Sequence, residues 1–203
     1  NSSGVSVATL VIPPNEGRIK SLVGDRATCV EQIVPLGTGD AVKCAIGENS
    51  HNENLMILCG DMPLILPETL VKMRVVHSES NACVTVLTGE SEHPTGMGRI
   101  VRERSGSVKA IVEENDADAS TLAIKEVNLG VYCFQYDWLS ENLENLEPSA
   151  SGELYLTDLV AIAVEQGQNV ASVQPLDTTE IIGINNRIEL AQAENVYRRR
   201  LRT

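Results

Sequence analysis

Short apolar runs alternate with amphipathic segments along most of this chain, and this alternation constrains the fold more than any other feature. Runs rich in β-branched residues and bounded by Pro, Gly or Asn are typical of strands, whereas apolar residues three and four positions apart are typical of helices. Alternating strands and helices predict an α/β fold with a mostly parallel open sheet flanked by helices. Segments 98–103 and 108–113 flank Ser105-Gly106-Ser107, which predicts an inserted antiparallel hairpin.

The chain has 203 residues, of which 42% are hydrophobic. That content is enough for one core that buries roughly 70% of the unfolded surface, so we expect residues 1–203 to form a single domain. The expected strands cover residues 8–12, 28–34, 55–58, 82–87, 126–134 and 170–173. The expected helices cover residues 17–23, 40–46, 67–77, 138–146, 156–163 and 187–201, the last with Ile188, Ala191 and Val196 on its inner side.

The formal net charge is −12, which argues against a nucleic-acid partner because phosphate backbones require a basic surface. No apolar stretch approaches the roughly 20 residues that a membrane span needs, so we expect no membrane association. The five cysteines are widely spaced and form no CxxC pair. Most of them lie in apolar runs, which indicates reduced thiols and a cytoplasmic protein.

Asp61 directly follows the apolar run Leu55-Met56-Ile57-Leu58-Cys59-Gly60. A short apolar run that is bounded by turn residues is typical of a buried strand in a parallel sheet. Open α/β sheets bind ligands at the carboxyl ends of their strands, where a carboxylate suits a hard cation that holds phosphates. The alternative is that Asp61 caps the helix that begins near Pro67.

Seven short motifs follow one another along the chain, and their order and spacing are specific although each alone is weak. They are Gln32 with Leu36-Gly37-Thr38-Gly39-Asp40-Ala41; Leu58-Cys59-Gly60-Asp61-Met62-Pro63-Leu64; Pro94-Thr95-Gly96-Met97-Gly98-Arg99-Ile100; Ile111-Val112-Glu113; Glu126-Val127-Asn128-Leu129-Gly130-Val131-Tyr132; Gly152-Glu153-Leu154-Tyr155-Leu156-Thr157-Asp158; and Gly183-Ile184-Asn185-Asn186-Arg187. Together they resemble the uridylyltransferase (pyrophosphorylase) domain of bacterial GlmU, a sugar nucleotidyltransferase. The resemblance runs from about Val11 to Leu201.

This resemblance implies a Rossmann-like nucleotidyltransferase fold and a particular reaction. N-acetylglucosamine-1-phosphate attacks the α-phosphate of UTP, pyrophosphate leaves, and the cell-wall precursor UDP-N-acetylglucosamine forms while Mg²⁺ bridges the phosphates. Such chemistry depends on positioning and charge neutralisation more than on a covalent group. The resemblance implies that Asp61 and Asn185 bind Mg²⁺, which usually accepts few protein oxygens beside phosphate and water. Asn185 could also cap the helix before Arg187.

The resemblance places Gln32, Gly37 and Thr38 at the uracil. A side-chain amide offers both a donor and an acceptor to a base edge, and glycine lets the backbone approach closely. The alternative is an ordinary loop in which Thr38 caps the next helix.

The remaining matched residues belong to the sugar pocket. A polar Asn128 within an otherwise apolar strand requires a hydrogen-bond partner, which already favours a functional role. Structural alternatives are a hairpin glycine at 98, a strand-end acid at 113 and a first-turn helix charge at 153. The matched residues are Gly98, Glu113, Asn128, Glu153, Tyr155 and Thr157.

Three departures from the family bear on activity. The family opens with a strand and a Gly-rich loop whose Arg and Lys hold the triphosphate. Nothing before Val11 in this chain resembles that loop. We therefore assign no catalytic residue and expect the first βα unit to be missing. Arg18 and Lys20 are the nearest basic pair. Cys59 stands where the family has an aromatic, and we expect no acetyltransferase β-helix, because residues 1–203 contain no hexapeptide repeat.

Three hypotheses remain from the sequence. The first is an active transferase whose opening unit lies upstream or in a second chain. The second is a non-catalytic relic that binds UTP, a UDP-sugar or a sugar-1-phosphate. The third is an assembly protein in which the exposed sheet edge drives formation of a homodimer.

Overall fold

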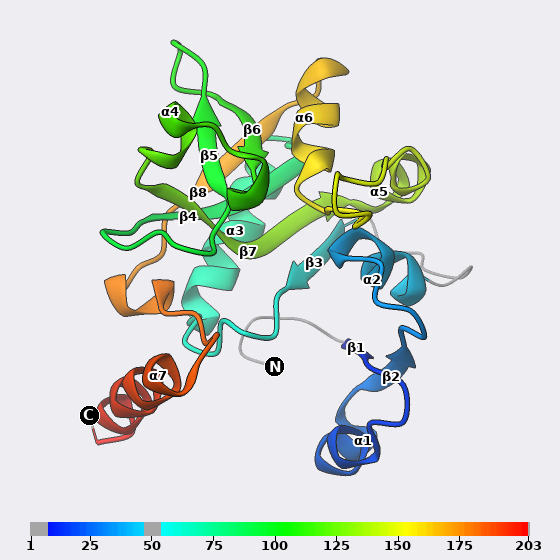
Figure 1. Cartoon of the computed structure of the whole chain (residues 1–203), viewed down its shortest axis with the longest axis vertical. Coiled ribbons are helices and arrows are strands. Elements are labelled where there is room, and N and C mark those ends of the chain that lie inside the picture. The colour runs from blue at the N-terminus through cyan, green and yellow to red at the C-terminus, as the bar shows by residue number, and fades with distance from the viewer. Residues whose placement is uncertain (1–7, 47–53, 203) are drawn as a thin grey trace.

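A computed structural model describes residues 8–46 and 54–202 (Figure 1). Its strands are β1 (Thr9–Ile12), β2 (Thr28–Glu31), β3 (Asn54–Leu58), β4 (Val84–Glu90), β5 (Arg99–Arg102), β6 (Val108–Val112), β7 (Glu126–Gln135) and β8 (Val170–Val173). Its α-helices are α1 (Gly17–Val23), α2 (Thr38–Ala45), α3 (Pro67–Glu79), α4 (Ala119–Leu122), α5 (Tyr136–Leu143), α6 (Asp158–Glu165) and α7 (Arg187–Arg200). Three 3₁₀ turns, η1 (Gly24–Arg26), η2 (Glu114–Asp116) and η3 (Thr178–Ile181), complete the described elements. The α/β class is confirmed.

The main sheet is mixed. Its strands lie in the order β6-β5-β7-β4-β8, and β3 also pairs with β7. β3, β4 and β5 are all antiparallel to β7, whereas β4 and β8 are parallel. The strands that alternate with helices therefore share one direction, as the sequence predicts, but β7 lies between them in the opposite direction. The predicted hairpin is confirmed, because β5 and β6 pair antiparallel on either side of Gly106.

The strand before Asp61 differs from the prediction of a buried strand in a parallel sheet. β3 pairs antiparallel with the second half of β7 and is only partly buried, with Leu58 46% exposed. The reason is its position, because β7 is its only strand partner among the described residues. β1 and β2 form a separate parallel pair, so the described sheet residues fall into two groups.

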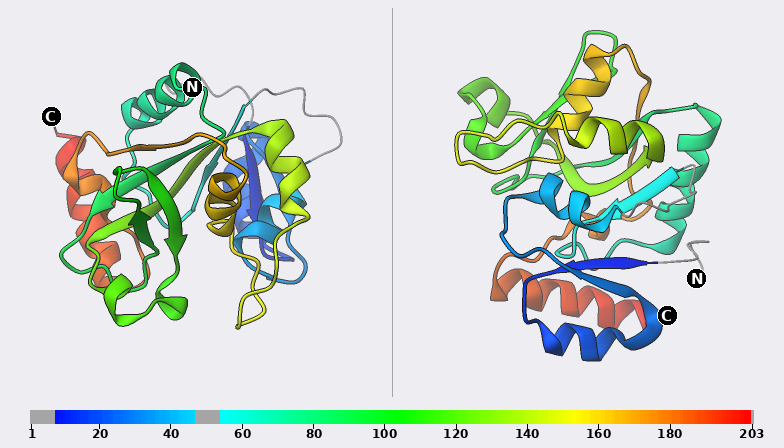
Figure 2. Two further views of the ribbon diagram at one scale, coloured as in Figure 1. Left: turned by 90° about the horizontal axis from the view of Figure 1, so that it is seen from above. Right: turned by 90° about the vertical axis from the view of Figure 1, so that its right-hand side faces the viewer.

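Helices cover both faces of the main sheet (Figure 2). Alternate residues of β7 point to opposite faces, as the two-residue period of a strand requires. Tyr132 and Phe134 pack in one core cluster with α5 and α6, and Val131 and Cys133 pack in a second cluster with Met73 of α3. Burial of these aliphatic side chains, at about 25 cal/mol per Å² of apolar surface, is what holds the layers together.

The last helix packs through a different face from the one that the sequence predicts. Ala193 is buried, whereas Ile188 is 72% exposed and Ala191 is exposed; Val196 is half-buried. The difference arises because α7 is fixed at its far end by a polar contact, in which Arg200 donates to the Leu64 carbonyl (2.6 Å). A polar contact of this kind leaves no trace in apolar periodicity.

All five cysteines are free thiols, and Cys83 and Cys133 are buried. Within residues 8–46 and 54–202, no helix is both long enough and apolar enough to cross a bilayer.

Candidate functional site

The two residues that the sequence assigns to Mg²⁺ lie on adjoining loops. Asp61 follows β3 after Gly60, and Asn185 lies in the loop that leads into α7. The backbone N–H of Ile184 donates to the carbonyl oxygen of Asp61 at 2.9 Å, so the loops touch next to both side chains. Both side chains are exposed, and neither forms a hydrogen bond within the described chain.

The capping alternatives for these two residues are wrong. Asn186, not Asn185, is the N-cap of α7, and its Oδ1 accepts from the N–H groups of Ile188 (2.9 Å) and Glu189 (3.0 Å). Leu66 occupies the N-cap position of α3 without any side-chain hydrogen bond. Because neither Asp61 nor Asn185 serves a helix terminus, their oxygen atoms are available for a ligand.

The chemistry of these oxygens fits Mg²⁺. A carboxylate and a carboxamide are hard oxygen donors, and two protein donors are typical when phosphates and water complete an octahedron. No three His, Cys, Asp or Glu side chains group as a metal site among the residues that the structure describes. The arrangement therefore suits a cation that arrives with phosphates rather than one enclosed by protein ligands.

The residues assigned to the base line a pocket of about 280 Å³. Gln32, Gly37 and Thr38 contribute to it from the β2–α2 loop and the start of α2. Glu153 and Tyr155, which the resemblance assigns to the sugar, also line this pocket. Glu153 is exposed and precedes α6 by several residues, so the alternative of a first-turn helix charge is wrong.

Gly37 is required by its surroundings. Its φ is +106°, and a Cβ atom there would lie 2.6 Å from the carbonyl oxygen of Leu154. The two segments are joined by hydrogen bonds from Gly39 N to Leu154 O (2.8 Å) and from Leu154 N to Leu36 O (2.7 Å). Only glycine permits this approach together with this φ.

Two side chains of the pocket have partners that the sequence does not predict. Thr38 does not cap α2; its Oγ1 accepts from Leu156 N at 3.0 Å and joins the two walls of the pocket. The Gln32 amide donates to Asp40 Oδ2 (2.7 Å) and to Gly37 O (3.1 Å). These two bonds use the NH₂ group of the amide, and the Gln32 carbonyl oxygen forms no hydrogen bond among the described residues.

Four residues assigned to the sugar form two hydrogen-bonded pairs that lie in one cluster. Asn128 N donates to Gly98 O at 2.9 Å, and Thr157 Oγ1 donates to Glu113 Oε1 at 2.9 Å. A Cβ atom at Gly98 would lie 3.3 Å from Glu113 Oε2, which places the two pairs side by side. Gly98 directly precedes β5, Glu113 directly follows β6, Asn128 lies in β7 and Thr157 directly precedes α6, so these four residues come together from separate segments.

The partner that Asn128 requires is Tyr132. The Asn128 amide donates to the Tyr132 hydroxyl oxygen (2.6 Å), and its carbonyl oxygen accepts from Gly130 N (3.0 Å). Gly130 has a φ of +64° and lies against Cys59, which would be 2.7 Å from a Cβ atom there. Neither Gly130 nor Tyr132 is predicted as a site residue, although both stand in the motif that carries Asn128.

The cluster is acidic. Burial raises the pKa of Glu113, the Thr157 hydrogen bond opposes that rise, and the charges of Asp158, Asp116 and Glu153 add to it. Burial, and then the charge of Asp116, also raises the pKa of Asp158. Burial, with Asp61 and Glu113 nearby, raises the pKa of Cys59 to about 11, so this thiol stays protonated. A phosphate that approaches this acidic cluster needs a cation beside it.

The basic pair near the start of the chain is partly occupied. Lys20 Nζ forms an ion pair with Glu31 Oε1 at 2.5 Å, which joins α1 to β2. That pairing also lowers the pKa of Glu31. The contact gives Lys20 a structural role in place of a free charge for a triphosphate.

Comparisons with known proteins show the family and the fold of this chain. The chain is 43% identical to the bifunctional protein GlmU of Heliobacterium modesticaldum and 37% identical to that of Clostridioides difficile. Each match covers 98% of this chain and 44% of the relative, so the chain spans less than half the length of these curated relatives. A crystal structure of UDP-glucose pyrophosphorylase complexed with UDP-glucose has a similar fold, with a TM-score of 0.72 at 17% identity over 98% of this chain and 83% of that one. Residues 14–179 match the nucleotidyl transferase family, to which this chain therefore belongs.

Proposed function

We propose that this chain provides the base, sugar and Mg²⁺ sites for uridylyl transfer from UTP to N-acetylglucosamine-1-phosphate, which yields UDP-N-acetylglucosamine and pyrophosphate in the cytoplasm. The observation that carries the proposal is the contact of the two loops through Ile184 N and Asp61 O. This contact supports the proposal because it joins the loops of a carboxylate and an amide that form no side-chain hydrogen bond among the described residues.

Each group has a task that its chemistry allows. The carbonyl oxygen of Gln32 accepts from the base edge, while its bond to Asp40 fixes the orientation of the amide. Glu113 and Asn128 orient the hydroxyl and acetamido groups of the sugar. Asp61 and Asn185 would hold Mg²⁺, which supplies charge neutralisation for the phosphates during transfer.

The test is pyrophosphate release from UTP, N-acetylglucosamine-1-phosphate and Mg²⁺, with calorimetry of UDP-N-acetylglucosamine binding beside it. We expect saturable binding by the wild type and none by Asp61→Ala. Absence of binding by the folded wild type would refute the assignment of the sites.

A second function, UDP-sugar binding without transfer, is favoured by one observation. Lys20 is engaged with Glu31, so the basic pair of α1 offers the triphosphate one cation fewer. Losing one donor to developing charge typically costs on the order of 10²–10³ in rate. Binding without pyrophosphate release would support this second function.

A further inference from the structure

Glu180 is a fully buried carboxylate between the two loops that carry Asp61 and Asn185. It lies in η3, five residues before Asn185, and sequence motifs give no sign of it. Among the described residues no cation forms an ion pair with it. Burying a carboxylate costs free energy unless hydrogen bonds compensate for the lost water, so Glu180 requires groups that donate to it.

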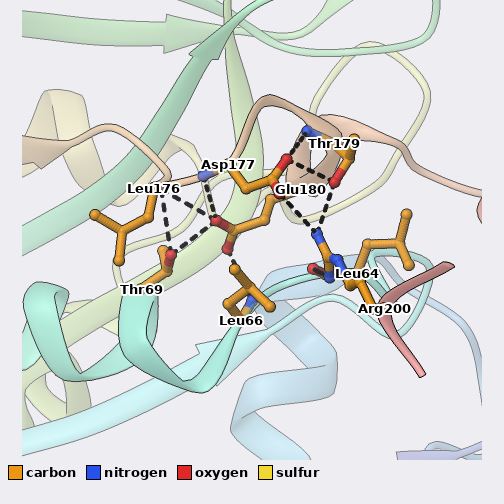
Figure 3. Close-up of polar contacts among 8 residues, drawn as sticks. All are labelled: Leu64, Leu66, Thr69, Leu176, Asp177, Thr179, Glu180 and Arg200. Carbon is orange, nitrogen blue, oxygen red and sulfur yellow. Dashed lines mark hydrogen bonds and ion pairs between the residues drawn. The ribbon is translucent and has the colours of Figure 1, made fainter. Parts of the chain in front are cut away.

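Four donors surround this carboxylate (Figure 3). Oε2 accepts from Leu66 N at 2.8 Å. Oε1 accepts from Thr69 Oγ1 (2.9 Å), Leu176 N (3.0 Å) and Asp177 N (2.9 Å). The donors come from the start of α3 and from the segment after β8, so one side chain joins two parts of the chain more than a hundred residues apart.

Hydrogen bonds join segments 61–66 and 179–184, which run in opposite directions. Ile184 N to Asp61 O is the tie at the metal end, and Leu66 N to Glu180 Oε2 is the tie at the other end. Beside the second tie, Arg200 donates to Leu64 O (2.6 Å) and to Thr179 Oγ1 (2.7 Å), as Figure 3 shows. Segments 61–66 and 179–184 are thus held together at both ends.

We propose that Glu180 is a positioning residue for the metal site: it keeps the loop of Asp61 in register with the loop of Asn185. This inference rests on the proposed function for its metal, but the coupling of the loops is a property of the protein alone. Charge-assisted hydrogen bonds to a buried carboxylate are short and directional, which suits them to fix a loop. Groups that orient metal ligands typically change metal affinity about 10–100-fold when they are removed.

The first variant is Glu180→Gln, which keeps the shape of the side chain. Its carbonyl oxygen can still face the three donors at Oε1, but its NH₂ group then faces Leu66 N–H, donor against donor. The second is Thr69→Val, which removes only one of the four donors and should therefore disturb the carboxylate less than Glu180→Gln does. Thr85→Val is the matched control, because Thr85 is equally buried but bonds to His77 instead (2.9 Å).

Two readouts are measured on the folded proteins. Hydrogen exchange reports the Ile184 amide, and electron paramagnetic resonance reports binding of Mn²⁺ alone, a cation that takes the same hard oxygen ligands. In Glu180→Gln we expect the Ile184 amide to exchange about tenfold faster and Mn²⁺ to bind about tenfold more weakly. Thr69→Val should change both in the same direction by less, and Thr85→Val should change neither.

The outcomes separate this inference from the proposed function. Unchanged exchange at Ile184 in Glu180→Gln overturns the coupling of the loops. Faster exchange with unaltered Mn²⁺ affinity overturns the positioning role, as would an equal effect in Thr85→Val. If the wild type binds no Mn²⁺, the metal assignment fails, the positioning role fails with it, and the Ile184 amide alone decides the coupling.

Discussion

At the scale of single residues, the site depends on backbone conformations and burial that side-chain chemistry alone does not show. Gly37 lets its own backbone approach the backbone of Leu154 at the base pocket. Glu113 is a half-buried carboxyl group with other acidic side chains around it. Both features have consequences for stability that can be separated from ligand binding.

Replacing Gly37 by alanine should destabilise the fold more than the same change at Gly106. Both glycines have positive φ, at +106° and +91°, but only Gly37 lies against backbone; a Cβ atom at Gly106 meets nothing within 4 Å. We expect Gly106→Ala to cost about 1–2 kcal/mol from conformational strain and Gly37→Ala more than about 3 kcal/mol. Urea unfolding measures both. Equal costs would show that the Leu154 segment moves away freely.

Glu113→Gln should stabilise the protein at neutral pH. The folded state raises the pKa of Glu113 above its ordinary value of 4.5, so the folded state binds the proton more tightly than the unfolded chain does. Wild-type stability therefore falls, relative to the variant, as the pH rises from 4.5 through the folded pKa. Glutamine keeps an oxygen that can accept from Thr157.

Unfolding curves from pH 4 to pH 8 measure the difference between Glu113→Gln and the wild type. Glu103→Gln is the control, because Glu103 is exposed and is not among the charges that raise the pKa of Glu113. A difference that stays constant with pH would contradict the raised pKa. If Glu113 binds the sugar, Glu113→Gln should lose sugar binding while its free energy of unfolding increases, because residues of functional sites often reduce stability.

At the scale of elements, much of the fold could be predicted because local patterns report local structure. The hairpin of β5 and β6 and the boundaries of α1 and β8 follow from turn residues and periodicity. The direction of β7 and the inner face of α7 could not be predicted. Strand direction depends on pairing partners distant in sequence, and α7 is held by Arg200.

In the candidate site, some residues could be predicted from the sequence and others could not. Asp61 could be selected because it follows a short apolar run, and Asn185 could be selected because the motif that carries it resembles the family. Glu180 could not, because nothing in its own segment, Thr178–Ile181, distinguishes a buried acid from an exposed one. Its four donors become visible only when α3 and the segment after β8 are brought together.

A buried histidine, His77, links α3 to β4. The buried His77 ring contacts Thr85 Oγ1 (2.9 Å) and Asn54 Oδ1 (3.1 Å), and burial lowers its pKa from 6.5. The unfolded chain binds the proton more tightly, so stability is present in full above pH 6.5 and is lost as the pH falls through the folded pKa. His77→Gln should remove this part of the pH dependence.

Thermal unfolding at pH 7.5 and pH 5.5 measures the contribution of His77. We expect the wild type to lose more stability over this interval than His77→Gln does. His93→Gln, at an exposed histidine, is the control and should behave as the wild type. If His77→Gln loses as much stability as the wild type, the ring is protonated in the folded state.

At the scale of the whole molecule, charge decides how a phosphate ligand can bind. The chain has a net charge of −12, and the cluster assigned to the sugar is itself acidic. A diphosphate that approaches such a protein is repelled unless a cation accompanies it. The loops of Asp61 and Asn185 are where that cation is expected, so binding of a UDP-sugar should require a divalent ion.

UDP-N-acetylglucosamine should raise the melting temperature in the presence of Mg²⁺ and should not do so in EDTA. A ligand that binds only the folded state stabilises it by about 2.7 kcal/mol at a hundred times its Kd. Asp61→Ala should abolish the shift, whereas Asp25→Ala should retain it; both remove one exposed negative charge, but Asp25 lies in η1. Loss of the shift in both variants would mean that overall charge, and not a ligand at Asp61, controls binding. A shift that persists in EDTA would mean that the protein holds the diphosphate with its own cations, and Arg18 would then be the first to replace.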